Sequence, residues 1–253
     1  EIVNDDMPFL VDSASMEVNR QGLTLHMIVH PIFAVERDSS GTPKTIDVRE
    51  NKPDWPRESF MHIEVDRLAD PAARAELAAG IERVLGDVRA AVTDWKAMVA
   101  QLRAVIEEID RQPPPLPREE VAENRAFLQW LTEDHLLLLG YRCHDLTTVD
   151  GEDALRLVPG SGLGILRESA TETALSSSFA VLPPQARAVA HAVSPMMFVT
   201  KANSRSTVHR PGYTDYIGIK RYDASGRVIG EHRFLGLFTS TAYSASVSET
   251  PLL

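Results

Sequence analysis

The chain has 253 residues, 43% hydrophobic and 25% charged, which are the proportions of a soluble globular protein long enough for two domains. Its formal charge of −10 argues against binding to DNA or to an anionic membrane surface, and no apolar run approaches the roughly 18–20 residues that span a bilayer. The single cysteine, Cys143, excludes an internal disulfide and fits a reducing compartment, so we expect a cytoplasmic protein.

The beginning of the chain predicts a small α+β unit. Its first residues are acidic, unlike a signal peptide, and both termini suggest a piece of a longer protein. Further on, apolar and polar residues alternate with the period of two that is typical of strands, and turn residues mark a hairpin. The expected elements are a strand end at 1–3, a short helix at 12–20, and strands at 23–35, 44–49 and 60–65.

A helix of about forty residues is expected next. Asp70 is an N-cap acceptor, Pro71 suits the first helical position, and no proline follows before Arg111. Apolar residues recur at spacings of three and four, which predicts one seam along a helix roughly 60 Å long at 1.5 Å per residue. Part of this seam should meet another domain or another chain. Gly80 and Gly86 are the positions where the helix is most easily interrupted.

A proline-rich linker at 112–117 ends this helix and predicts the domain boundary. We therefore expect a first domain at 1–111 and a second at 118–253. The second domain begins with an amphipathic helix and continues as an antiparallel sheet. Its expected elements are helices at 119–132 and 184–192 and strands at 135–146, 154–158, 161–166, 196–202, 212–222 and 227–239.

Three closely spaced glycines invite comparison with a nucleotide-binding loop. A dinucleotide fingerprint joins a strand to a helix, so that the amides of the helix meet the pyrophosphate. In the run from Gly160 to Gly164 the third glycine falls one residue early, and no helix follows. Pro183 and Pro184 stand where an acidic residue is needed. We interpret the run as a hairpin turn and expect no cofactor in this chain.

The sequence predicts neither a metal site nor an activated nucleophile. His26 and His30 are about 13 Å apart on one strand, too far for one zinc ion, and His62 brings no thiolate or obvious carboxylate with it. Cys143 and His144 are neighbours on a strand, so they point to opposite faces. Because no Gly-x-Ser-x-Gly elbow occurs either, we expect no catalytic residue.

The most conspicuous polar stretch is the segment 201–211. Lys201, Arg205 and Arg210 place three cations within ten residues, among hydroxyls and an amide. Such a combination can hold a carboxylate or a phosphate. The alternative, which we favour, is an interdomain contact with acidic surface elsewhere in this acidic protein, because ion-paired contacts are commoner than ligand sites.

A second candidate site is the loop that joins the first strand to the first helix. Exposed amides at such a junction can bind a small anion or the carboxylate of an amino acid. Asn4, Asp5 and Asp6 lie in this loop, where the carboxylates repel an anion but attract an ammonium group. The alternative is a capping turn in which Asp5 or Asp6 accepts hydrogen bonds from the same amides.

Distinctive strings of residues occur in order along nearly the whole chain. They are N-D-D-M-P-F-L-V-D-S from Asn4, L-T-L-H-M-I-V-H-P from Leu23, F-L-x-W-L-x-x-D-H from Phe127, L-G-Y-R from Leu139, G-L-G-I-L-R from Gly162, T-K-A-N-S-R-S-T-V-H-R-P from Thr200, D-Y-I-G from Asp215 and F-L-G-L-F-T-S from Phe234. Together they resemble the non-catalytic N-terminal region of the large bacterial NAD-specific glutamate dehydrogenases. The run Leu136 to Leu138 departs from that family, in which aromatic residues are expected.

The resemblance implies a parent oxidoreductase that deaminates L-glutamate to 2-oxoglutarate and ammonia with NAD as cofactor. Its catalytic domain would lie far downstream, and its catalytic lysine and Rossmann glycines have no counterpart here. For this chain the resemblance implies an α+β fold. Residues 1–111 would form an ACT-like (ferredoxin-like) domain with a truncated first strand and a long helix, and residues 118–253 a PAS-like antiparallel-sheet domain.

Two roles are compatible with a non-catalytic fragment of such an enzyme. In the first, the fragment is regulatory, and a bound amino acid biases the distant active site. ACT-type domains bind amino acids near the first strand–helix loop, which carries over to Asn4, Asp5 and Asp6; Lys201, Arg205 and Arg210 are further candidates. In the second, the fragment is purely architectural and builds a homo-oligomer together with the downstream domains.

Overall fold

The chain forms two compact units in the computed structural model, which describes residues 1–253 except 49–51, 53, 169–178, 247, 249 and 253. Unit 1 comprises residues 1–92 and 206–211, and unit 2 comprises residues 93–205 and 212–253. The units therefore divide inside the long helix and not at the proline-rich segment. The physical reason is that the second half of that helix packs into the core of unit 2.

Unit 1 is built on an antiparallel sheet that has five strands in the described residues. The central strand β5 pairs with β1, β3 and β2, and β4 pairs with β3 as the predicted hairpin. Pro31 interrupts the single strand predicted at 23–35, because proline has no N–H for the ladder. The elements are β1 (Ile2–Asp5), α1 (Leu10–Arg20), β2 (Leu25–Val29), β3 (Ile32–Arg37), β4 (Pro43–Asp47) and β5 (Arg57–Val65).

The long helix α2 (Pro71–Arg111) is continuous, which confirms the prediction. Asp70 caps its start, since its Oδ1 accepts a hydrogen bond from the Ala72 amide at 3.0 Å. Part of the first half of the apolar seam is buried in unit 1, where Leu77 and Ile81 stay half-buried, and most of the second half is buried in unit 2. The fully buried seam residues are Val84 and Val88 in unit 1 and Met98, Leu102, Val105 and Ile109 in unit 2.

Unit 2 contains an antiparallel sheet of seven strands in the described residues, in the order β10-β11-β12-β6-β7-β9, with β8 also paired to β6. The short elements β9 and α6 were not predicted. Before the sheet come α3 (Arg118–Trp130) and a π-helical turn at Leu131–His135. The remaining elements are β6 (Leu136–Val149), β7 (Glu152–Leu157), β8 (Leu163–Gly164), β9 (Phe179–Val181), α5 (Pro184–His191), β10 (Met197–Arg205), β11 (Tyr213–Tyr222), β12 (Val228–Phe238) and α6 (Ser240–Ser244).

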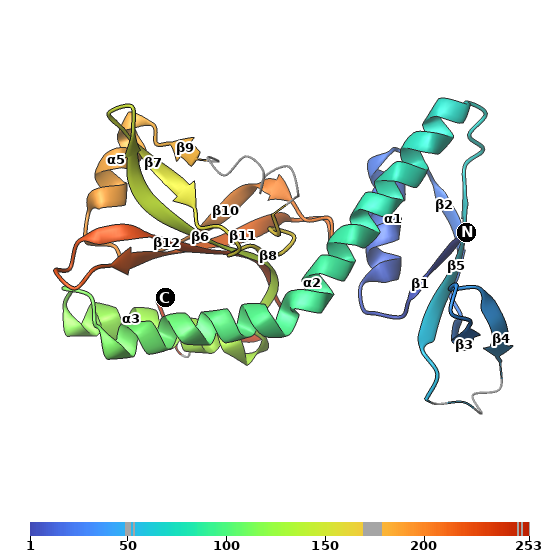
Figure 1. The fold of residues 1–253 in the computed structure, drawn as a ribbon, viewed down its shortest axis with the longest axis horizontal. Coiled ribbons are helices and arrows are strands. Elements are labelled where there is room, and N and C mark those ends of the chain that lie inside the picture. Colours follow the sequence, from blue (N-terminus) through green and yellow to red (C-terminus); the bar gives the residue numbers. More distant parts are fainter. Residues whose placement is uncertain (49–51, 53, 169–178, 247, 249, 253) are drawn as a thin grey trace. The chain divides into compact units, whose positions relative to one another are not determined.

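The core of unit 2 lies between one face of this sheet and the helices α2 and α3, which run along it in Figure 1. Phe234 of β12 is fully buried there, together with Leu102 of α2 and Leu128 of α3. The observed mixture of helices and antiparallel sheets agrees with the predicted α+β class. It gives no separate support to the finer PAS-like assignment.

The buried carboxylate of Asp94 fastens α2 to the short strand β8 and to Arg167, which follows that strand. Asp94 is 8% exposed, and its carboxylate accepts two hydrogen bonds from the Arg167 guanidinium, both 2.5 Å, and one from the Gly164 amide at 2.8 Å. The hydrogen bond from Arg167 is the main reason that the pKa of Asp94 is held below its ordinary value. The pair therefore stabilises unit 2 only while Asp94 is ionised.

We expect Asp94→Asn to lower the free energy of unfolding of unit 2 by about 1.5 kcal/mol at neutral pH, because a hydrogen-bonded charge is lost. The folded-state pKa lies below the unfolded one, so this stability is present above the unfolded value, about pH 4, and is lost as pH falls through the folded value. Urea unfolding at several pH values measures it. Asp110→Asn, which removes an equally bidentate but exposed pair with Arg125, is the control and should cost less than about 0.5 kcal/mol. Equal losses in both variants would contradict the argument.

Candidate functional site

The junction between β1 and α1 borders a cavity of about 460 Å³, which we call the α1-head cavity. It is lined by residues 6–12 together with His30 and Ile32. Phe9 occupies the N-cap position with φ 72°, and its side chain offers no acceptor for the amides of this helix start. Capping by Asp5 or Asp6, the alternative considered from the sequence, is therefore not what the structure shows. Among the residues that the structure describes, no side chain accepts a hydrogen bond from the first-turn amides of α1, and residues of that turn line the cavity.

The three candidate residues of this loop have different environments. The Arg89 guanidinium of α2 donates to Asn4 Oδ1 at 2.6 Å and to Asp5 Oδ2 at 2.5 Å. Asp6 instead lines the α1-head cavity. Asn4 and Asp5 are thus tied to α2, and Asp6 is the one of the three that can meet a molecule in that cavity.

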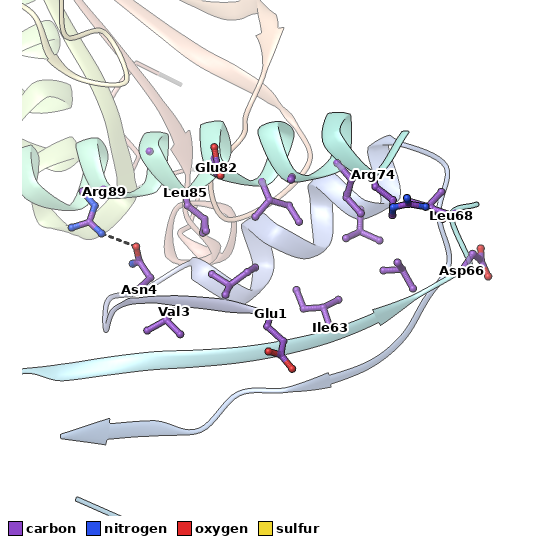
Figure 2. A pocket seen from close by; sticks show the side chains of 17 residues that line it. Glu1, Val3, Asn4, Ile63, Asp66, Leu68, Arg74, Glu82, Leu85 and Arg89 are labelled. Carbon is purple, nitrogen blue, oxygen red and sulfur yellow. Dashed lines mark hydrogen bonds between the residues drawn. The ribbon is translucent and has the colours of Figure 1, made fainter. Parts of the chain in front are cut away.

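A second cavity, of about 760 Å³, lies in unit 1 between the first half of α2 and the sheet (Figure 2). Leu77, Ile81 and Leu85 of α2 and Ile63 and Val65 of β5 give it an apolar lining. This cavity is not visible in the sequence, because its walls come from segments far apart in the chain. The only hint of the cavity in the sequence is the apolar seam of α2, because unit 1 does not bury all of the apolar residues in the first half of that seam.

Two of the three cations in the segment 201–211 have partners within unit 2. Lys201 forms an ion pair with the buried Asp215 at 2.6 Å, and the Arg205 guanidinium lies 5.1 Å from the centre of the Tyr213 ring. Both interactions are within unit 2. Arg210 belongs to unit 1, where its amide donates to the Val208 carbonyl at 3.0 Å.

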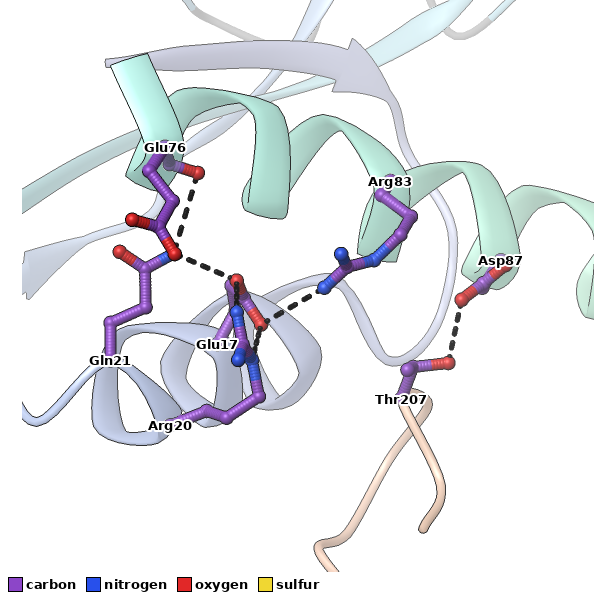
Figure 3. A network of polar contacts seen from close by, with 7 residues as sticks. All are labelled: Glu17, Arg20, Gln21, Glu76, Arg83, Asp87 and Thr207. Carbon is purple, nitrogen blue, oxygen red and sulfur yellow. Dashed lines mark hydrogen bonds and ion pairs between the residues drawn. The ribbon is translucent and has the colours of Figure 1, made fainter. Parts of the chain in front are cut away.

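Residues 206–211 form the part of this segment that belongs to unit 1, and we call it the docked segment. Thr207 Oγ1 donates to Asp87 Oδ2 of α2 at 2.7 Å, as Figure 3 shows. Val208 is fully buried, and the His209 amide donates to Ser13 Oγ of α1 at 3.1 Å. The docked segment therefore touches both helices of unit 1.

A buried carboxylate holds α1 against α2 (Figure 3). Glu17 of α1 is 2% exposed and accepts hydrogen bonds from Arg20 at 2.6 and 2.7 Å and from Gln21 at 2.8 Å, with Arg83 of α2 at 3.5 Å. These partners, Arg20 first, lower the pKa of Glu17. Gly80 gives the carboxylate room, because a Cβ at that position would lie 2.0 Å from Glu17 Oε1.

The glycine run of unit 2 has its amides occupied by carboxylates of the protein. The Gly160 amide donates to Glu168 Oε1 at 2.8 Å, and the Gly164 amide donates to Asp94. The run joins β7 to β8, and both strands pair with β6, so it is a turn between strands that are not paired to each other. The predicted hairpin is wrong in that respect. The helix that a dinucleotide fingerprint needs does not follow in the described residues.

The histidines considered for zinc each have a separate polar partner. His26 lies 2.9 Å from Asp66, His30 lies 2.5 Å from Ser59 Oγ, and His62 lies 3.4 Å from Glu64. Among the residues that the structure describes, no group of three or more histidines, cysteines or acidic residues is placed to hold a metal ion.

Cys143 and His144 lie on opposite faces of β6, as predicted. Cys143 packs in the core of unit 2, and burial raises the pKa of its thiol. Burial, with the nearby Arg233 and Arg142, lowers the pKa of His144 to about 4. Cys143 is therefore a protonated thiol at neutral pH and not an activated nucleophile, and the lowered pKa makes the neutral His144 ring a weak proton acceptor. Within the described residues, no helix is both long and apolar enough to traverse a lipid bilayer.

Known proteins resemble this chain both in its first 81 residues and over its full length. Residues 1–81 match the family model described as "Glutamate dehydrogenase, ACT1 domain". Over its full length the chain is 38% identical to an NAD-specific glutamate dehydrogenase of Halomonas elongata and 37% identical to one of Pseudomonas aeruginosa. It is 28% identical to an NAD-specific glutamate dehydrogenase of Mycobacterium tuberculosis.

The chain is much shorter than these relatives. It spans 16% of the length of the first two and 14% of the third, and all of it is covered in each comparison. The resemblance to the N-terminal region of large NAD-specific glutamate dehydrogenases, inferred from short strings of residues, is confirmed.

Proposed function

We propose that this chain is the regulatory N-terminal part of a cytoplasmic, homo-oligomeric NAD-dependent glutamate dehydrogenase, and that unit 1 binds an amino-acid effector in the α1-head cavity. The parent enzyme would convert L-glutamate and NAD to 2-oxoglutarate, ammonia and NADH in downstream domains. This chain spans only 16% of the length of such relatives, and its own part in the proposal is binding. The ACT1 match over residues 1–81 is the observation that carries the proposal.

The geometry of the α1-head cavity supports a zwitterionic ligand. The first-turn amides of α1 have no side-chain acceptor, and amides at a helix start attract a carboxylate. Asp6 and Asp12 line the same cavity and can attract an ammonium group. A volume of about 460 Å³ is within the range of ligand pockets. For Lys201 and Arg205 we propose a structural role within unit 2 in place of ligand binding, since they already engage Asp215 and Tyr213.

Calorimetric titration of the chain with the common L-amino acids, one at a time, tests this function. We expect saturable heat from one or two of them, and Asp6→Asn should weaken that binding by about tenfold, or 1.4 kcal/mol. Asp5→Asn is the matched control, because Asp5 is tied to Arg89 and does not line the cavity. It should leave the affinity within about twofold. Equal losses in the two variants would place the ligand elsewhere, and silence across all amino acids would contradict the proposal.

A purely architectural role is the second candidate, and the 760 Å³ cavity favours it. Its apolar lining from α2 is only half-buried, and Trp95 further along α2 is 44% exposed. Such surface suits contacts with other domains or chains. This role predicts no heat with any amino acid and a mass that rises with protein concentration in light scattering.

A further inference from the structure

We infer that the docked segment, residues 206–211, responds to the occupancy of the α1-head cavity, so that ligand binding there and docking of the segment are thermodynamically linked. The ligand side of this inference rests on the proposed function, because it takes that cavity as the effector site. The link between the segment and the head of α1 rests on contacts within unit 1 alone.

His209 contacts two residues that line the cavity. Its ring lies 5.1 Å from the ring of Phe9, centre to centre, and its Nδ1 lies 3.4 Å from Asp12 Oδ2. Phe9 and Asp12 both belong to the cavity wall. A ligand that moves either side chain therefore changes a direct partner of His209.

The docked segment is held in a single well-defined position. Ser13, next to Asp12, is fully buried, and its Oγ accepts the hydrogen bond from the His209 amide. Val208 is fully buried beside it, and Ser206 Oγ bridges to both the amide and the carbonyl of Val208 at 3.1 and 2.7 Å. A packed contact of this kind has a docked and an undocked state rather than a continuous range.

Both partners of the ring contact have an unusual backbone conformation. Phe9 has φ 72° and His209 has φ 70°, and residues with a side chain are uncommon in this left-handed region. Such conformations persist only where the surrounding contacts enforce them. Because Phe9 is also the N-cap of α1, a carboxylate bound to the first-turn amides acts on the peptide next to this strained residue.

The docked segment is covalently connected to two strands of the sheet of unit 2, so a change in its docking can affect their ends. It joins β10 to β11, and the pairing of these two strands becomes irregular between Lys201 and Arg205, just before the segment begins. A change in docking would thus act on strand ends whose ladder is already locally disrupted. Sequence reasoning marked this stretch as polar and did not reveal that its far half belongs to unit 1.

Amide hydrogen exchange of the 253-residue chain tests the link without any ligand. His209→Ala should speed exchange of the amides of residues 9–13 by about threefold or more, and Phe9→Leu should do the same for residues 206–211. Ser15→Ala is the control, since the Ser15 hydroxyl bonds Val11 O of its own helix at 2.7 Å. It should change neither region. Circular dichroism establishes that each variant is folded before exchange is compared.

The outcomes separate this inference from the proposed function. If His209→Ala loosens residues 206–211 and leaves residues 9–13 unchanged, the link does not exist. If the link is present, the amino acid with the largest saturable heat should alter the protection of residues 206–211. By thermodynamic reciprocity, the factor by which undocking through His209→Ala changes the Kd of this amino acid should equal the factor by which the amino acid changes the docking equilibrium. If no amino acid gives heat, the proposed function fails while the variant comparison still decides the link.

Discussion

Replacing Gly80 with alanine is expected to destabilise unit 1 by about 2–3 kcal/mol, although alanine favours a helix over glycine by about 1 kcal/mol. The added Cβ would lie 2.0 Å from Glu17 Oε1 and 2.9 Å from Gln21 Nε2. Because the carboxylate is buried, it can move away only by breaking or re-forming its hydrogen bonds to Arg20 and Gln21. Leaving a buried charge without partners costs more than the helix gains.

Gly86→Ala on the same helix is the matched control. No atom outside the local helix lies within 4 Å of its added Cβ, so only the helix preference acts and stability should rise by up to about 1 kcal/mol. Urea unfolding, followed by amide exchange of α1, measures both variants. If Gly80→Ala and Gly86→Ala both raised or both lowered the free energy of unfolding, the contact with Glu17 would not be what makes Gly80→Ala destabilising.

A double-mutant cycle identifies the cause. In a Glu17→Ala background the closest obstacle is gone and the Gln21 amide loses the partner that holds it, so Gly80→Ala should become neutral or stabilising. The coupling between the two substitutions should be about 2 kcal/mol, which is typical of residues in direct contact. Additive effects would mean that Gly80 is needed for another reason, such as the path of the helix backbone.

The Gly80 case also shows what the sequence could and could not predict. The spacing of apolar residues is a local property, and it correctly predicted α2 across both glycines. The reason for Gly80 lies in Glu17, more than sixty positions earlier in the chain, and no periodicity encodes that contact. The same limit applies to the docked segment, whose partners Ser13 and Asp87 are distant in sequence.

The candidate site could be predicted only in part, because local sequence patterns reveal its loop but not the contacts between distant segments. The strand–helix junction at Asn4 to Asp6 was found because a change of period and a loop are visible in the sequence. The pairing of Arg89 with Asn4 and Asp5 depends on where α2 crosses the sheet, which is a property of tertiary packing. The division of the chain was placed at the prolines because they end a helix, whereas burial along α2 places the boundary of the compact units near Val92.

A larger effect is expected at Gly164, where alanine should cost unit 2 about 3–4 kcal/mol. Gly164 has φ 61°, which disfavours any side chain, and its added Cβ would lie 2.1 Å from the Leu139 carbonyl oxygen. That oxygen belongs to the backbone of β6 and accepts a hydrogen bond from the Ile165 amide at 2.9 Å, so it cannot rotate away as a side chain can. The strained φ and the overlap therefore act together.

Gly160→Ala separates the two contributions. Gly160 lies four residues earlier with φ 74°, but nothing is within 4 Å of its added Cβ, so only the conformational term of about 1 kcal/mol remains. Urea unfolding monitored by tryptophan fluorescence measures both, since Trp130 packs against the core of unit 2. Displacing Gly164 also pulls its amide from Asp94, so Gly164→Ala should reduce the further loss caused by Asp94→Asn. If the two glycine variants lose the same stability, the close approach of β8 to β6 is not what requires glycine at position 164.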